Sequence, residues 1–154
     1  MGIGGSGSSY AIRENYLDLD PTYTDNYGRP LLRITFEFPD NDLKMQNYVS
    51  KQCEQLARSL NPKILTVGKV RSGWNAVPYQ STHNTGGAVM GADPKTSALN
   101  KYLQSWDVSN LFVVGASAFP QNAAMNPTGT VGMLAYWTAE AIRNRYLKAP
   151  GPLN

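Results

Sequence analysis

Hydrophobic and polar residues alternate strictly over residues 33–38, which is the pattern of a half-buried β-strand. The alternation places Ile34, Phe36 and Phe38 on one face of that strand. Upstream, residues 10–30 contain Asp-Pro, Gly and Asn at positions typical of turns, and predict short extended pieces rather than long elements.

A helical period follows the strand. Apolar residues recur every three or four positions, which indicates one buried stripe on an amphipathic helix; they are Leu43, Met45, Val49, Cys53, Leu56 and Leu60. We expect this helix over residues 42–60, because Asp40 or Asn41 can cap its start and Pro62 prevents its continuation. Because Cys53 lies on this stripe, we interpret it as a core residue with no catalytic or metal-binding role.

The centre of the chain is less regular. Residues 64–70 alternate and suggest a second strand, and residues 96–104 suggest a short helix. Between them, residues 72–93 are rich in Gly, Pro and Asn without a strong period. A loop of this length in a compact domain is typically functional.

Two apolar segments dominate the last third of the chain. Residues 110–115 form a continuous apolar run closed by Gly115, which is typical of a strand buried on both faces. Residues 126–147 then predict a long helix with basic residues in its last turn, where they suit the helix dipole. Its predicted buried side is Val131, Leu134, Ala135, Thr138, Ala139 and Ile142. The N-terminus of this helix should point free amide groups at whatever lies beyond the strand.

The sequence contains few charged residues for a domain that stands alone. Charged residues make up 16% of the 154 residues, against about 25% in an average domain, while the apolar share of 42% is ordinary. The length is sufficient for one domain with its own core. One explanation for the missing charge is that part of the surface packs on another domain, another subunit or a large apolar cofactor.

Several classes of site and partner are excluded by residue counts. The net charge is only +3 and no basic run is present, so nucleic acid is not the expected partner. Cys53 is the only cysteine and His83 the only histidine, which excludes a disulfide framework and cysteine-cluster or multi-histidine metal sites. No apolar stretch approaches the roughly 20 residues that span a bilayer.

The first nine residues are rich in glycine and serine. They contain the letters of a G-x-G-x-x-G fingerprint at Gly2, Gly4 and Gly7, but only Met1 stands where a strand is required. They also lack the basic and apolar regions of a signal peptide. We therefore interpret residues 1–9 as a flexible linker or a cloning remnant.

His83 lies in a glycine-rich loop, His-Asn-Thr-Gly-Gly, at residues 83–87. An imidazole can act as an acid or base at neutral pH, and adjacent glycines let the backbone approach a flat ligand. Taken alone, such a histidine is more commonly structural, and Asn126-Pro127 taken alone is a helix start. A serine or cysteine hydrolase is poorly supported, since no G-x-S-x-G elbow accompanies His83. A glycosidase is equally weak, because no acidic residue lies in a loop beside aromatic platforms.

Three segments in this order resemble the C-terminal region of the glucose-methanol-choline (GMC) oxidoreductases, which are FAD-dependent. They are HNTGGAVMGADP at 83–94, SNLFVVGASAFP at 109–120 and NPTGTVGMLAYWTAEAI at 126–142. The interval of 43 residues from His83 to Asn126 fits the spacing of the family's two active-site polar residues. The resemblance covers about residues 10–147 and is closest to the sugar and sugar-acid dehydrogenases, the branch of gluconate, sorbitol, fructose and glucose dehydrogenases.

The resemblance implies a role for each matching residue. His83 matches the catalytic histidine that takes the hydroxyl proton as the alcohol carbon gives a hydride to the flavin. Asn126 matches a second position, His or Asn in the family, which holds the substrate oxygen. The positions that match cofactor-binding residues of the family are Gly115, Ala116, Asn126, Pro127, Thr128, Gly129 and Thr130. Many relatives have an acidic residue where this chain has Gly115, so a side-chain contact to the cofactor is lost there.

The resemblance also implies a fold of mixed α+β and α/β class, and it implies how the chain is divided between domains. Residues 10–78 would contribute strands and a helix to the substrate-binding domain, residues 79–148 would supply the last strand and helix of the FAD-binding domain, and residues 149–154 would form a tail. The family's N-terminal strand–G-x-G-x-x-G–helix unit has no counterpart here. We therefore expect the C-terminal portion of a longer enzyme, inactive alone.

The expected activity is oxidation of an alcohol group of a sugar, sugar acid or polyol by an FAD-dependent dehydrogenase. The alternative is an autonomous, non-catalytic binding or assembly module that kept the fold. The implied partners are the N-terminal part of the same enzyme and a cytochrome or small subunit. The branch implies the bacterial periplasm or the periplasmic face of the membrane.

Overall fold

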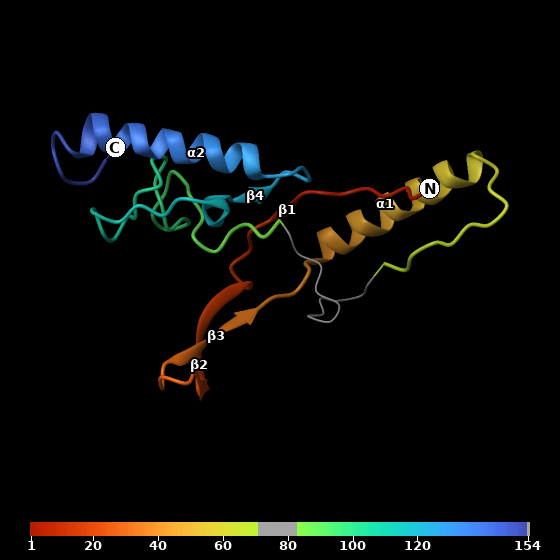
Figure 1. Cartoon of the computed structure of the whole chain (residues 1–154), viewed down its shortest axis with the longest axis horizontal. Coiled ribbons are helices and arrows are strands. Elements are labelled where there is room, and N and C mark those ends of the chain that lie inside the picture. Colours follow the sequence, from red (N-terminus) through yellow and green to blue (C-terminus); the bar gives the residue numbers. More distant parts are fainter. Residues whose placement is uncertain (71–82, 154) are drawn as a thin grey trace.

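The computed structural model describes residues 1–70 and 83–153, and Figure 1 shows how these parts are arranged. The elements are β1 (Ser9–Tyr10), β2 (Tyr16–Thr24), β3 (Pro30–Thr35), α1 (Asp40–Ser59), η1 (Ala116–Ala118), β4 (Gln121–Asn122), α2 (Thr128–Ala141) and η2 (Ile142–Tyr146). In the described residues the strands pair as β1 with β4 and β2 with β3, both antiparallel. Helices beside antiparallel strands confirm the α+β class.

The β2–β3 hairpin projects from the rest of the chain (Figure 1). Its register pairs Leu17 with Ile34 and Leu19 with Leu32. The predicted strand at 33–38 is displaced, since β3 ends at Thr35. The long strand β2 was not predicted, because Pro21 lies within it; an irregularity in the register between Leu19 and Thr24 accommodates this proline.

Helix α1 begins and ends within two residues of the prediction. Residues 1–8 lie along it as an extended segment (Figure 1). A β-carbon at Gly5 would approach Val49 Cγ1 to 2.5 Å, so the segment passes close over the stripe that was predicted to be buried. Cys53 on this stripe is half-buried.

Helix α2 covers the loops of residues 83–127 (Figure 1), and the helix continues as the π-helical turn η2, which confirms the predicted helix. Its residues Leu134 and Thr138 are buried as predicted. Ala139, predicted to be buried, is exposed, and Ala141 is buried instead. The first core cluster consists of Leu99, Leu103, Ala118, Phe119 and Leu134, with Ala88, Met90, Val113 and Val131 packed against it.

Three predicted elements are wrong in the described residues. Residues 64–70 form no strand, and residues 96–104 form turns with isolated bridges rather than a helix. The apolar run at 110–115 is not a paired strand, although Phe112 forms a bridge with Gln104. A strand forms only where a neighbouring strand satisfies its backbone groups, and local patterns do not supply that neighbour.

Two buried amide side chains fasten the last residues of the chain. Asn100 Nδ2 donates to the carbonyl of Leu153 at 2.8 Å, and Gln104 Oε1 accepts from the backbone N–H of Leu153 at 2.7 Å. Gln104 Nε2 donates to the carbonyls of Gly151 at 2.9 Å and Ser109 at 2.6 Å. Leu153 is consequently buried beside Tyr102 and Ala141 in a second cluster.

Large apolar side chains are exposed on several elements. On the hairpin they include Leu17, Leu19, Leu32 and Ile34, and Leu111 and Val114 are each 46% exposed in the apolar run at 110–115. Patches of this kind are typical of surfaces that another protein segment covers. Among the described residues, none of the helices has both the length and the hydropathy that a bilayer span requires.

Candidate functional site

The loop that begins at His83 is fixed at its backbone. The carbonyl oxygen of His83 accepts a hydrogen bond from Asn122 Nδ2 at 3.0 Å, and the imidazole is exposed. Asn122 belongs to β4, which pairs with β1 through Ser9. His83 is thus placed by residues distant in sequence, with its ring available to a ligand.

The same loop then runs beside the 3-10 helix η1. The backbone N–H groups of Gly86, Ala88 and Met90 donate to the carbonyls of Ala116, Ser117 and Ala118 at 3.1, 3.0 and 2.9 Å. These three bonds join the first resembling segment to the second. Since Ala88 and Met90 also pack on the cluster that contains Leu134 of α2, all three segments meet around one core.

Two glycines in this junction have backbone conformations that other residues rarely adopt. Gly86 has φ 81°, and a β-carbon there would lie 3.2 Å from the β-carbon of Ala11. Gly115 has φ 134° and comes directly before η1. Glycine suits both positions, because a positive φ of this size strains a residue with a side chain.

The N-terminus of α2 is open. The first hydrogen bond of the helix runs from the Val131 N–H to the Pro127 carbonyl at 2.9 Å, and no side chain caps the helix. Thr128, Gly129 and Thr130 are exposed, as is Asn126. Their amides precede that first bond, so this end of the helix can donate to a polar or anionic group.

The two predicted active-site residues, His83 and Asn126, make no direct contact through a hydrogen bond in the described part of the chain. The two residues are connected through Asn122, four positions before Asn126, and through the core under η1. Asn122 was not predicted, because no periodic or motif signal marks an amide that bonds a backbone carbonyl 39 positions away.

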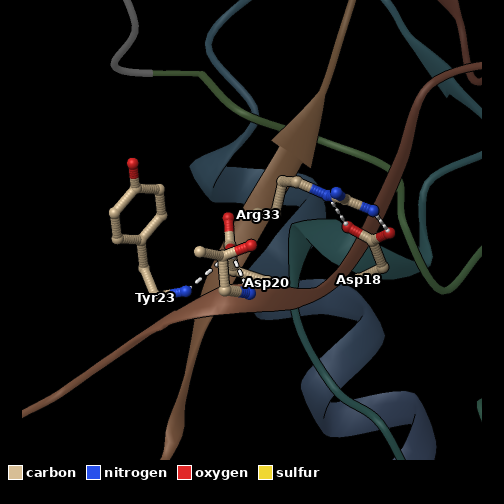
Figure 2. A network of polar contacts seen from close by, with 5 residues as sticks. Asp18, Asp20, Tyr23 and Arg33 are labelled. Atoms are coloured by element: carbon tan, nitrogen blue, oxygen red, sulfur yellow. Dashed lines mark hydrogen bonds and ion pairs between the residues drawn. The ribbon is translucent and has the colours of Figure 1, made fainter.

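The hairpin approaches this site with its apolar face. A β-carbon at Gly87 would lie 4.0 Å from Leu17 Cδ1, which places one end of β2 beside the His83 loop. Alternation along the strand puts Asp18 on the opposite face, where Arg33 forms a two-pronged ion pair with it (Figure 2). The Arg33 guanidinium lowers the pKa of the Asp18 carboxyl.

Asp20 also lies on the polar face, and its carboxylate accepts hydrogen bonds from the backbone N–H groups of Tyr23 at 2.9 Å and Thr22 at 2.8 Å (Figure 2). These bonds lower the pKa of Asp20. The polar face therefore satisfies its own charges, and the apolar face reaches the candidate site at Leu17.

Comparison with known proteins gives the family. The model of the GMC oxidoreductase family matches residues 11–135. The chain is 53% identical over 149 residues to a gluconate 2-dehydrogenase flavoprotein of Pantoea cypripedii, covering 96% of this chain and 24% of that protein. It is 34% identical to a 2-methyl-1,2-propanediol dehydrogenase of Mycolicibacterium austroafricanum, covering 91% of this chain and 24% of that protein.

A third relative is the fructose dehydrogenase large subunit of Gluconobacter japonicus, which is 30% identical over 84% of this chain and 23% of that protein. The chain thus spans about a quarter of the length of the curated relatives it matches. The family match covers the first two segments and the third as far as Ala135 in α2, and so includes the loop of His83 and the open helix N-terminus. The chain belongs to the GMC oxidoreductase family.

Proposed function

We propose that this chain is the C-terminal portion of an FAD-dependent dehydrogenase that oxidises a CH–OH group of a sugar, sugar acid or polyol. The observation that carries the proposal is the junction of the His83 loop with η1 and α2 around one core. The segment of His83, the segment of Gly115 and helix α2 all contribute side chains to this core, which supports a shared site for the residues they carry. The 53% identity to a gluconate 2-dehydrogenase flavoprotein supports the substrate class.

The residues present fit FAD. Gly115 and Ala116 would lie against its ribityl and pyrophosphate groups, where a residue without a side chain permits close approach. Pro127, Thr128, Gly129 and Thr130 form the uncapped end of α2, which stabilises negative charge by about 0.3–1 kcal/mol when exposed and more when partly buried. When bound, FAD accepts the hydride that leaves the alcohol carbon.

His83 would act as the general base. A neutral imidazole accepts the proton of the alcohol hydroxyl at physiological pH, and the exposed ring of His83 is free to reach a substrate. Asn126, at the start of α2, would hold the substrate oxygen with its amide. The backbone hydrogen bond at His83 fixes the residue without occupying its ring.

The proposed domain organisation assigns residues 10–78 to a substrate-binding domain and residues 79–148 to the FAD-binding domain. The boundary between them lies outside the described residues. The remainder of the enzyme would cover the exposed apolar side chains of the hairpin and of the run at 110–115. The further partners proposed are a cytochrome or small subunit, with the periplasm as the location.

The experiment that tests this function compares the isolated chain with the enzyme of which it forms part. Each is supplied with FAD, a redox dye and a panel of sugars, sugar acids and polyols. We expect the isolated chain to self-associate on size exclusion without reducing dye, because its apolar surfaces are uncovered. We expect the enzyme to reduce dye with at least one CH–OH donor.

Two results would contradict the proposal. An isolated chain that is a stable monomer, binds FAD tightly and oxidises a sugar would be a complete enzyme. An assembled protein that binds FAD but is reduced by none of the donors would favour the alternative, a binding or assembly module that kept the fold.

Asn126 provides a graded test of the helix N-terminus. Asn126→Asp adds a negative charge at the end of α2 where negative charge must be stabilised during reduction, so we expect slower flavin reduction in stopped-flow measurements. Asn126→His should be tolerated better, because an imidazole can also hold the substrate oxygen. Equal reduction rates in the Asp and His variants would remove the electrostatic argument.

A further inference from the structure

The side chain of Asn122 links the two loops that carry the candidate catalytic groups. Its Nδ2 donates to the backbone carbonyl of His83 at 3.0 Å, and its Oδ1 accepts from the backbone N–H of Ala124 at 3.3 Å. Ala124 lies in the turn between β4 and Asn126. One half-buried amide therefore restrains both the residue at 83 and the turn that leads to residue 126.

The turn at Ala124 needs such a restraint. Ala124 has φ 60°, a left-handed conformation that is unfavourable for alanine and persists where the surroundings impose it. The hydrogen bond from its N–H to Asn122 Oδ1 is a local interaction that does so. The backbone of Asn122 is itself held by pairing of β4 with Ser9 of β1.

His83 depends on the same amide. Among the hydrogen bonds of the described residues, His83 is held by the bond from Asn122 to its carbonyl and by none to its ring. The position of the imidazole therefore follows from the position of the backbone, and the backbone is positioned by Asn122.

We propose that Asn122 is a positioning residue, whose amide sets the distance between His83 and Asn126 so that both reach the same CH–OH group. This inference rests on the proposed function. The two ends of the amide act separately: Nδ2 positions His83, and Oδ1 shapes the turn before Asn126. A side chain without an N–H donor loses the first of these contacts.

The test measures flavin reduction per bound FAD in the enzyme that contains this chain, with kcat and KM determined separately. Asn122→Ala removes both contacts, while Asn122→Asp keeps an acceptor for Ala124 and replaces the donor to His83 with a carboxylate oxygen. We expect both variants to reduce flavin about tenfold more slowly with little change in KM, since small displacements of reacting groups have large effects on rate. The matched control is Gln121→Ala on the same strand, which we expect to leave the rate unchanged.

A second arm places Asn122→Asp, which removes the donor to His83 and keeps the acceptor for Ala124, in a His83→Ala background. If Asn122 acts through His83, the second substitution adds little to the loss, as expected for coupled residues. An undiminished rate in Asn122→Asp, a full additional loss in the double variant, or a change in FAD content alone would each overturn the inference. Failure of the unsubstituted, FAD-loaded enzyme to react with any CH–OH donor would instead overturn the proposed function, and this inference with it.

Discussion

His83→Ala is expected to lower kcat for alcohol oxidation in the assembled enzyme by about a hundredfold or more, while FAD remains bound. The substitution removes the only imidazole of the chain and leaves the backbone carbonyl that Asn122 binds. The loop should therefore keep its position, and the loss should be one of proton transfer rather than of folding. Steady-state kinetics normalised to bound flavin provide the measurement.

A matched control for this variant is Thr85→Ala in the same loop, which removes a side chain that is neither acid nor base. It should retain most of the activity. Unchanged turnover in His83→Ala would remove this residue from the role of base.

Gln104→Leu is expected to increase amide hydrogen exchange in the core around Leu103 by about a hundredfold, which corresponds to roughly 3 kcal/mol of local stability. Gln104 is 1% exposed, and its amide bonds three backbone groups, those of Ser109, Gly151 and Leu153. Leucine has a similar volume but no polar atoms, so these groups would be left without their partner in a buried position.

Hydrogen exchange followed by mass spectrometry resolves this effect in the segment that contains Leu103. The matched control is Gln121→Leu, the same change at an exposed glutamine. It should leave exchange around Leu103 unaltered. If the two variants exchange equally fast, the buried amide of Gln104 contributes nothing specific to the stability of this region.

Both long helices could be predicted from the sequence, because a period of 3.6 residues reports a property that lies within one segment. Strands were predicted less well. The alternation at 64–70 and the apolar run at 110–115 are consistent with strands, yet neither is paired along its length in the described residues. Pairing depends on a partner elsewhere, which no local pattern reveals.

In the candidate site, too, the residues that lie in one segment could be predicted, and those that depend on distant partners could not. His83, Gly115 and the start of α2 could be found because they lie in contiguous segments that resemble a family. Asn122 and Gln104 could not, since each acts through hydrogen bonds to backbone groups that the fold brings near: His83 is 39 positions from Asn122, and Leu153 is 49 positions from Gln104. A side-chain amide that hydrogen-bonds a distant backbone group produces no periodic pattern in the sequence.

The pairing of β1 with β4 affects the order in which the molecule is completed during synthesis. Ser9 and Tyr10 leave the ribosome about 110 residues ahead of their partners Asn122 and Gln121. At about 5–20 residues per second, the first strand waits roughly 6–22 s for its partner. The hairpin and α1 can form during that interval, because their contacts are local. The region around His83 is completed only after Asn122 has emerged, so a pause or truncation before that residue would leave the hairpin and α1 folded while the candidate catalytic loop lacks its partner.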